Sequence, residues 1–361
     1  MVTVVGLPGL LHTALTYRST DELLGALTPL VGTWLSASDR VIVSLGPGRS
    51  DALRSELGAD AGLVWWSDTS LRPPHPARRL RAFHEVTQRE HRLGHGQVRF
   101  VSEHSFPAEL PELVTEWERF DLVLDDALAG TPATVVCTFD LTAVPERVLE
   151  HVAGTHPMLG VDPAVASTEY RRSADFLEVP SVLSALPATA SRLGGCVSPS
   201  QARALVRDVL GASGGHAAMR QGVDDLTVAV TELVTNAWQA GAESIDVWCW
   251  RSRGEMGVQV DDDGPGLRAP LAGYRPPLAG AAGGRGLWIV RQVADLAEIA
   301  CDGRGTSVRA RILEDRRRRL RAQGASEEDA LGQLGAVLLA DRSGARSRVD
   351  RSDMVAGRIG S

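Results

Sequence analysis

The chain has 361 residues, of which 43% are hydrophobic and 23% charged, a globular composition that predicts two domains or three. Its net charge of -7 disfavours direct nucleic-acid binding, because dedicated binders usually carry a basic domain. All 38 basic residues are arginine, so a complete P-loop, which needs a lysine on the phosphates, is excluded. The sequence shows no basic leader region and no apolar run near the ~18 residues of a membrane span, so we expect a soluble, cytoplasmic protein.

The cysteines are widely spaced and form no Cys-x-x-Cys pair. Zinc ribbons and disulfide scaffolds show closer or more regular spacing. We therefore expect reduced, buried thiols rather than a zinc site or a disulfide framework. The cysteines are Cys137, Cys196, Cys249 and Cys301.

The first half of the chain alternates helical and strand patterns. Ser19 offers an N-cap before Asp21 and Glu22, and leucines then recur at helical spacing. Helices alternating with β-branched runs favour a mainly parallel α/β sheet. The expected strands are residues 40–45, 63–66, 97–101 and 133–139, with a glycine turn at 46–50 and a helix over 51–57.

The glycine turn at Gly46 lies where a nucleotide-binding α/β protein would hold phosphates. Because it lacks the lysine, we interpret it as an ordinary loop.

Several short motifs in this half resemble the MEDS sensory domain, a RecA/KaiC-like α/β module without a functional P-loop. They are His12 and Tyr17 in His-Thr-Ala-Leu-Thr-Tyr, Glu103 after a strand, Cys137-Thr-Phe-Asp140, and Thr155-His156-Pro157. Two motifs depart from the family, since Cys-Thr-Phe-Asp replaces Cys-Pro-Tyr-Asp and Glu103-His-Ser-Phe106 replaces Glu-Pro-x-Trp. The resemblance covers residues 1–160 and implies a sensor of a small ligand.

The polar residues of these motifs form a candidate sensory pocket. They could converge at strand ends as a ligand or metal site. The alternative is that they are hydrogen-bonded residues that hold loops together. The candidates are His12, Tyr17, Glu103, Cys137, Asp140 and His156.

Residues 161–187 are rich in proline and small residues, and we interpret them as a linker to a second domain over 188–313. That domain begins with a strong helix start, in which Ser198, Pro199 and Gln201 complete a capping box. A second apolar-periodic helix follows, with Glu232 and Asn236 one turn apart on one side.

An antiparallel hairpin is expected next, from strands over residues 244–250 and 256–260. Side chains alternate along a strand, so Asp262 continues the apolar face of Met256, Val258 and Val260. A carboxylate there is partly buried and needs a hydrogen-bond donor, which favours Asp262 over Asp261 as an inward-facing residue.

A loop over residues 267–282 lacks an apolar period, and loops of this length are often functional. The glycine-rich run 283–287 then opens a helix over 288–296, whose N-terminus can bind phosphates. Thr306 precedes the last strand, over 307–312.

These signals, in this order, resemble the ATP-binding boxes of the GHKL superfamily, whose Bergerat fold is an α+β sandwich of an antiparallel sheet with helices on one face. The resemblance implies ATP and Mg²⁺ as cofactors, Glu232 as catalytic base, Asn236 as Mg²⁺ ligand and Asp262 as adenine contact. The resemblance also implies that the loop over residues 267–282 is a lid over the bound ATP. The implied nucleotide contacts are Asn236, Asp262, Gly264, Gly266, Gly284, Arg285, Gly286, Leu287 and Thr306.

The kind of GHKL protein follows from what surrounds these boxes. Residues 159–198 contain no histidine and too many prolines for the phosphoacceptor hairpin of a histidine kinase, and His216 is expected in a loop. The chain also shows no large transducer domain of the gyrase or chaperone type. A minimal ATPase after a MEDS-like domain resembles the RsbA-type anti-sigma regulators, which are related to the anti-sigma serine/threonine kinases.

The resemblance implies a sensor-gated protein-serine kinase that binds a sigma factor and phosphorylates a STAS-domain antagonist. Two alternatives remain: a nucleotide-dependent binding switch without significant phosphotransfer, and a divergent histidine kinase with a separate phosphoacceptor protein. We expect neither nucleic acid nor membrane as a direct partner, and a homodimer stays open. Residues 314–361 are expected to form a charged helical or disordered tail.

Overall fold

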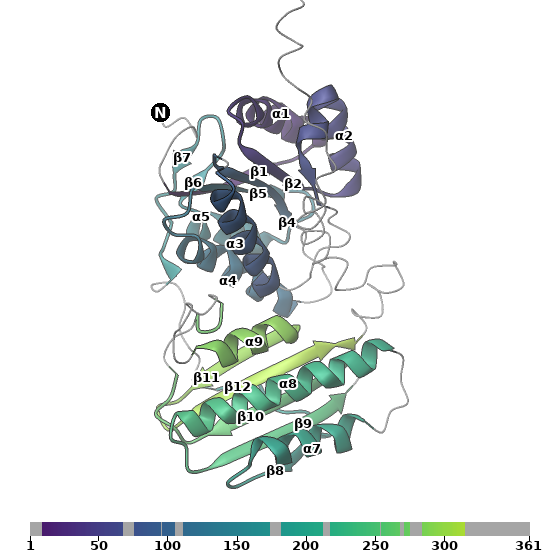
Figure 1. The fold of residues 1–361 in the computed structure, drawn as a ribbon, viewed down its shortest axis with the longest axis vertical. Helices are drawn as coiled ribbons and strands as arrows, with labels where there is room; N and C mark the ends of the chain where they lie inside the picture. The colour runs from purple at the N-terminus through teal and green to yellow at the C-terminus, as the bar shows by residue number, and fades with distance from the viewer. Residues whose placement is uncertain are drawn as a thin grey trace, which may run out of the picture.

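The computed structural model describes residues 9–67, 76–94, 96–104, 111–173, 182–211, 217–252, 254–267, 271–274 and 284–314. They form two sheets, each with its own helices (Figure 1). The predicted C-terminal tail and most of the predicted lid lie outside the described residues, as does His216.

The N-terminal sheet has seven strands in the order β3-β2-β4-β5-β1-β6-β7. All its neighbouring strands are parallel except β6 and β7. The strands are β1 (Leu10–Tyr17), β2 (Arg40–Ser44), β3 (Trp65–Trp66), β4 (Val98–His104), β5 (Ala133–Asp140), β6 (Met158–Leu159) and β7 (Val165–Ala166).

Helices cover both faces of this sheet, so its central strand β5 is buried along its whole length. On one face lie α1 (Thr20–Ser36), capped by Ser19 as predicted, and α2 (Pro47–Leu57), followed by the 3₁₀ turn η1 (Gly58–Leu63). On the other face lie α3 (Pro76–Arg92), α4 (Pro111–Ala127) and α5 (Glu146–Thr155). Alternate residues of β5 therefore enter two different cores: Val136 packs on the α1 side, while Cys137 packs on the α4 side.

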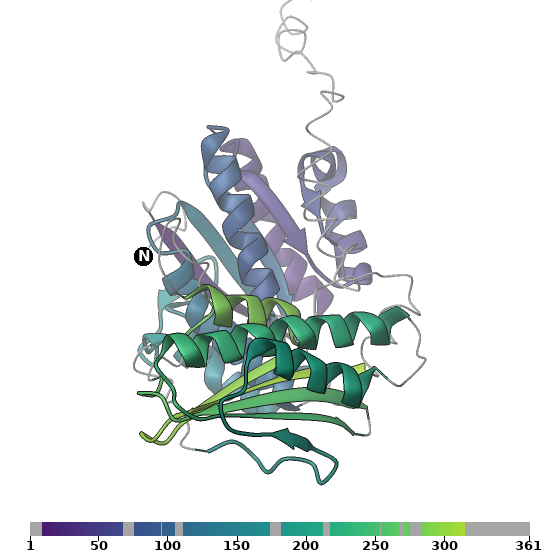
Figure 2. The same cartoon turned by 60° about the horizontal axis from the view of Figure 1, so that its bottom comes forward.

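The C-terminal sheet is antiparallel, in the order β11-β12-β10-β9-β8. Its helices all lie on one face, over a single apolar core (Figure 2). The strands are β8 (Ser191–Leu193), β9 (Ile245–Ser252), β10 (Glu255–Asp262), β11 (Leu296–Cys301) and β12 (Thr306–Leu313), and the helices are α7 (Pro199–Leu210), α8 (Ala217–Gln239) and α9 (Arg285–Val293).

The two sheets confirm the predicted fold class, a mainly parallel α/β part followed by an α+β sandwich. The capping box of Ser198 and Gln201 is present at the start of α7, as predicted. The predicted helix over 288–296 is wrong at its end, because α9 stops at Val293 and Leu296 begins β11. The expectation of buried thiols is also wrong for Cys196, which is exposed.

The segment between the two parts is more structured than a linker pattern suggests. Within the predicted linker, β7 extends the first sheet, and Ser184 is anchored on the second sheet by Arg309, whose Nη1 lies 2.8 Å from the serine Oγ. The parts also touch directly, since α3 and α4 contact α9 and β11 (Figure 1).

Candidate functional site

A cavity of about 560 Å³ lies between α8, the strands β10 and β12, and the start of α9. It contains six of the residues expected to contact a nucleotide: Asn236, Asp262, Gly266, Gly284, Leu287 and Thr306. These come from four separate stretches of the chain, which the fold brings to one place.

Asp262 lies at the end of β10, where its backbone pairs with Thr306 of β12. Its Oδ1 accepts a hydrogen bond from the backbone N–H of Gly264, 2.9 Å away. Burial raises the pKa of Asp262, and the N–H of Gly264 offsets only part of that effect. A partly buried carboxylate with a raised pKa gains from a further hydrogen-bond donor, which the amine of adenine could supply.

The two neighbouring aspartates, Asp261 and Asp263, point elsewhere and have other hydrogen-bond partners, as the alternation of side chains along β10 predicts. Asp261 points to the opposite face of the sheet, where its carboxylate accepts from Trp248 Nε1 at 2.7 Å. Asp263 is exposed, and it accepts from the backbone N–H groups of Glu243 and Ser244 at 2.8 and 2.9 Å.

Asn236 and the start of α9 meet because Gly286 has no side chain. A Cβ at Gly286 would lie 2.5 Å from the carboxamide of Asn236. Gly305 allows a similar approach, since a Cβ there would lie 1.7 Å from the carbonyl oxygen of Asp262. The glycines therefore let backbone segments close around the cavity.

The N-terminus of α9 borders the same cavity through Gly284 and Leu287. Gly284 adopts a left-handed conformation (φ 77°) at the N-cap, where glycine has no side chain with which to cap the helix. The first backbone N–H groups are thus available to an anion, which the helix dipole also favours. Arg285, at the first helical position, is exposed and does not line the cavity.

Glu232 lies one helical turn before Asn236 on α8 and is half-buried. It is not among the residues that line the cavity, and neither is Gly264. The structure thus places the expected metal ligand in the cavity and the expected base beside it.

The apolar wall of the cavity was not predicted as part of the site. Its apolar side chains suit a purine ring and come from α8, β10, β12 and the neighbouring loops. The periodic pattern in the sequence marked Leu233, Ala237 and Val260 as core without showing that they border a cavity, and it gave no signal for the other wall residues. The wall residues are Leu233, Ala237, Ala240, Val260, Leu267, Leu271 and Val308.

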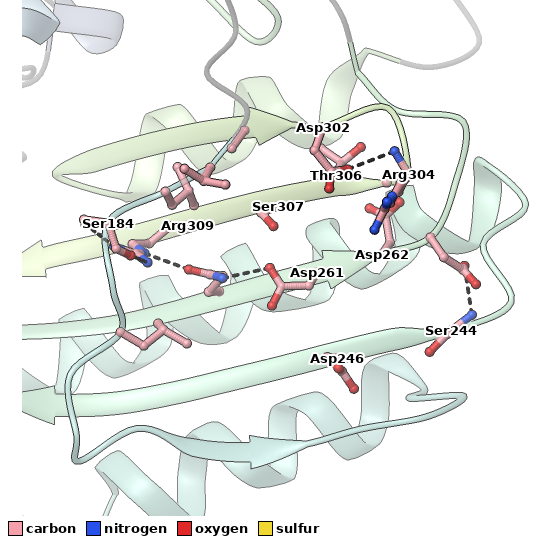
Figure 3. Close-up of a pocket in the computed structure, with 17 residues that line it drawn as sticks. Ser184, Ser244, Asp246, Asp261, Asp262, Asp302, Arg304, Thr306, Ser307 and Arg309 are labelled. Atoms are coloured by element: carbon pink, nitrogen blue, oxygen red, sulfur yellow. Dashed lines mark hydrogen bonds between the residues drawn. The ribbon is translucent and has the colours of Figure 1, made fainter.

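A second cavity, of about 520 Å³, lies on the face of the sheet opposite α7, α8 and α9 (Figure 3). Polar side chains stand on it, including Asp246, Asp261 and Arg309. Arg309 is bound there by Gln259 Oε1 at 2.8 Å and by the carbonyl oxygen of Ser184 at 2.6 Å. This face therefore holds the segment that leads into the second domain.

The six N-terminal candidates do not form one pocket. His12, Cys137 and His156 lie together on the α4 and α5 side of the sheet. The other three, Tyr17, Glu103 and Asp140, lie at the strand ends on the α2 side. Strand alternation explains the division, because Cys137 and Asp140 are three residues apart on one strand and so point to opposite faces.

The α2-side group occupies the place where the glycine turn would hold a phosphate. Glu103 accepts a hydrogen bond from the backbone N–H of Gly46, 2.5 Å away, and another from the hydroxyl of Tyr17, 3.3 Å away. Arg49 bridges Glu103 and Asp140. Burial alone would raise the pKa of Asp140, but hydrogen bonds from Thr142 and the charge of Arg49 lower it below its usual range. A carboxylate thus takes the position of an anion, which agrees with the interpretation of this turn as an ordinary loop.

Each of the two parts of the chain matches a known protein family. Residues 11–157 match the family "MEthanogen/methylotroph, DcmR Sensory domain" (MEDS), and residues 197–312 match the family "Histidine kinase-like ATPase domain". The chain therefore contains a MEDS domain followed by a histidine kinase-like ATPase domain. A search of the curated proteins found no match.

Two solved structures are similar to parts of the chain. The first is the histidine kinase domain of the E. coli osmosensor EnvZ, with 21% identity over 36% of this chain and 90% of that one, and a TM-score of 0.21. The second is the flagellar accessory protein FlaH from Methanocaldococcus jannaschii, with 13% identity over 42% of this chain and 70% of that one, and a TM-score of 0.25. Among the described residues, no helix is both long and apolar enough to cross a bilayer.

The residues around the first cavity fit ATP with Mg²⁺. The apolar wall and the partly buried Asp262 suit adenine, while the uncapped start of α9 suits phosphates. Asn236 offers a carboxamide oxygen, a hard ligand of the kind Mg²⁺ prefers, at the junction with α9. This donor set supports ATP binding by the C-terminal domain.

Proposed function

We propose that this protein, a MEDS domain joined to a histidine kinase-like ATPase domain, is an ATP-binding anti-sigma regulator of the RsbA type. In this proposal it binds a sigma factor and phosphorylates a serine on a STAS-domain antagonist, under control of its N-terminal domain. The observation that carries the nucleotide part is the cavity in which Asp262, Asn236 and the open start of α9 come together. The partners are proposed from the combination of the two domains.

In this chemistry the chain's own residues have separate tasks. Asp262 accepts from the adenine amine, and the N–H groups at the start of α9 receive phosphate oxygens. Asn236 would hold Mg²⁺, which would neutralise charge on the phosphates. Glu232, one turn away from Asn236, orients the attacking serine hydroxyl or accepts its proton.

The region between the two domains supports a kinase that acts on a partner protein rather than on its own histidine. Within residues 158–173 and 182–196, which leave out 174–181, the structure has short strands and no helical hairpin. An internal phosphoacceptor hairpin therefore has no place in this part of the described chain.

Control by the N-terminal domain is supported by contacts with the described part of the lid. Leu271, Ala272 and Gly273 line the nucleotide cavity, and the next residue, Tyr274, is buried in the core of the MEDS domain. Its hydroxyl donates to Glu116 Oε2 of α4 at 2.7 Å. One short segment thus contacts both the cavity and the sensory domain.

Arg291 of α9 reinforces this contact. Its guanidinium lies 3.8 Å from the centre of the Tyr274 ring and 3.7 Å from Glu116, and its Nε donates to the carbonyl oxygen of Ala272 at 2.9 Å. Arg78 of α3 also donates to the carbonyl oxygen of Gln292. A shift of α3 or α4 would therefore move the lid segment and α9 together.

The test is phosphotransfer from labelled ATP in the presence of Mg²⁺ to a STAS protein that binds the chain. We expect an acid-stable phosphoserine with the wild type, and a loss of at least about 100-fold in rate with Glu232→Ala, because general base catalysis contributes roughly 10²–10⁴-fold. ATP affinity should stay within a few-fold of the wild type. Asp224→Ala, an exposed acid on the same helix, is the matched control and should keep the wild-type rate.

A Glu232→Ala variant that still transfers phosphate at the wild-type rate would refute the role of Glu232. An acid-labile product would instead indicate phosphohistidine and the divergent histidine kinase.

A binding switch without significant phosphotransfer is the second candidate. It is favoured by one observation, the position of Glu232 outside the lining of the cavity. For a pure switch, ATP changes the affinity for the sigma factor while no phosphate reaches the STAS protein. One incubation separates the two functions when both the binding of the sigma factor and the labelled phosphate on the STAS protein are measured.

A further inference from the structure

Four potential metal ligands meet in the interior of the MEDS domain, away from the nucleotide cavity. His12 comes from β1, Cys137 from β5, Asp121 from α4, and His156 from the end of α5. All four are buried, and one ligand atom of each lies within 4.8 Å of the others. Asp121 was not among the residues expected from the sequence, because its helix gave no motif.

The spacing of these atoms is close to that around a tetrahedral metal ion. His12 Nε2 lies 3.5 Å from Cys137 Sγ, and Asp121 Oδ1 lies 3.9 Å from the same sulfur. Ligands bound to Zn²⁺ at about 2.0–2.3 Å are roughly 3.3–3.8 Å apart, by tetrahedral geometry. Since the four atoms lie within 4.8 Å of one another, a contraction of at most about 1 Å would bring them to the spacing around an ion.

Both histidines have one ring nitrogen fixed by an acceptor, which leaves the other nitrogen with its lone pair toward the cluster. His12 Nδ1 lies 3.2 Å from a carboxylate oxygen of Asp125, which Tyr170 holds in turn through a 3.0 Å hydrogen bond. His156 Nδ1 lies 3.0 Å from the carbonyl oxygen of Val152. Histidine ligands to metals characteristically donate their second N–H to such carboxylates and carbonyls.

One atom of the cluster lacks a partner. His156 Nε2 is fully buried and has no hydrogen-bond partner among the described residues. A buried nitrogen with an unused lone pair is costly in an apolar core unless something binds it. A metal ion at the centre of the cluster would satisfy this atom.

The charges also balance around a divalent cation. The thiolate of Cys137 and the carboxylate of Asp121 contribute two negative charges, equal to that of the ion. Nearby, buried Arg79 interacts electrostatically with both of these ligands. His104 Nε2 holds Asp121 Oδ1 at 3.0 Å, so the carboxylate is oriented as well.

We propose that His12, Asp121, Cys137 and His156 form a buried tetrahedral site for Zn²⁺ in the MEDS domain. One thiolate, two imidazoles and a carboxylate form a donor set that suits Zn²⁺, and four protein ligands leave no open position for a reacting water. The site is therefore structural or sensory rather than catalytic. It does not depend on the function proposed for the ATPase domain, and it has no Cys-x-x-Cys signal because it uses a single cysteine.

Cobalt provides the direct test, because tetrahedral Co²⁺ absorbs in the visible range and a thiolate ligand adds a charge-transfer band in the near ultraviolet. The untagged full chain, first stripped of metal with a chelator, is titrated with Co²⁺. We expect both signals to saturate at one Co²⁺ per chain and to be lost on addition of Zn²⁺. A chain that shows neither signal would overturn the site.

Two variants locate the metal. Cys137→Ser should abolish the charge-transfer band, whereas Cys249→Ser, a buried cysteine of the other domain, should keep it. A band that survives Cys137→Ser would place the metal elsewhere and overturn the proposal.

If Cys137→Ser does not fold, Asp125→Asn provides a second test. Asp125 is not itself a ligand, but it orients the ligand His12. We expect the substitution to weaken Zn²⁺ binding about 10- to 100-fold, as loss of such an orienting carboxylate typically does. Wild-type affinity in this variant would contradict the assignment of His12 Nε2 as a ligand.

Discussion

At the scale of single residues, the shape of the nucleotide cavity depends on glycines as much as on the side chains that line it. Gly286 lets the carboxamide of Asn236 lie against the first turn of α9. A methyl group there would meet the end of a flexible side chain, which can move aside at low cost. The expected result is a displaced Asn236 in a domain that still folds.

Gly286→Ala should therefore lower the affinity for ATP with Mg²⁺ by roughly tenfold or more, because the metal ligand moves, while the thermal midpoint changes little. Fluorescent-nucleotide titration and a melting curve measure the two quantities. Gly25→Ala is the control: it lies on α1 with no atom within 4 Å of the added Cβ, so it should leave the affinity unchanged. Equal affinities for wild type and Gly286→Ala would refute the role assigned to this contact.

Residue patterns pointed to polar residues that the fold brings to one cavity, but they did not reveal most of its apolar wall. Alternation along β10 was enough to place Asp262 in the cavity and Asp261 on the other face. The same rule, applied to Cys137 and Asp140, would have shown that the six sensory candidates cannot share one pocket. Asp121 gave no signal, because a lone acid on a helix has no pattern until the fold places it beside His12.

At the scale of elements, α4 and the segment 271–274 connect the two domains. Tyr274 is buried in the MEDS core, and three residues before it line the nucleotide cavity. The hydrogen bond from Tyr274 to Glu116 holds this segment in place. A hydrogen bond to a charged group contributes about 1.5–3 kcal/mol, enough to bias the position of a short segment.

Tyr274→Phe removes this hydrogen bond while keeping the ring in its place. We expect ATP to dissociate several-fold faster, because residues 271–273 are less firmly held against the cavity. Stopped-flow chase of a fluorescent nucleotide measures the rate. Tyr17→Phe is the matched control, since it loses a 3.3 Å hydrogen bond to Glu103 on the α2 side of the MEDS domain.

An unchanged dissociation rate in Tyr274→Phe, or an equal increase in both variants, would show that this contact does not control the lid.

The order of the elements was predictable from turns, caps and periodicity, while their exact ends were not. The expected helix after the glycine run extended three residues too far, because Ala294 to Leu296 continue an apolar pattern that fits either state. The strand β11 was missed for the same reason. Its assignment depends on pairing with β12, which is a tertiary contact.

At the scale of the whole molecule, α4 carries residues of both sites. Glu116 contacts Tyr274 of the ATPase domain, while Asp121 of the buried cluster and Asp125, which orients His12, lie roughly one and a half and two and a half turns further along the helix. Under the proposed control, a change at the cluster would reach the lid through α4. This arrangement is what a sensor that controls an ATPase requires.

The central claim is that the cavity beside Asp262 binds ATP, and calorimetric titration of the full chain with ATP and Mg²⁺ tests it most directly. We predict one ATP per chain, and an affinity about 10- to 100-fold lower for Asp262→Asn, because a hydrogen bond to a charged acceptor is weakened. Asp261→Asn, on the opposite face of the same strand, should bind ATP nearly as the wild type does. A wild-type chain that releases no binding heat, or an Asp262→Asn variant that binds with unchanged affinity, would contradict the account.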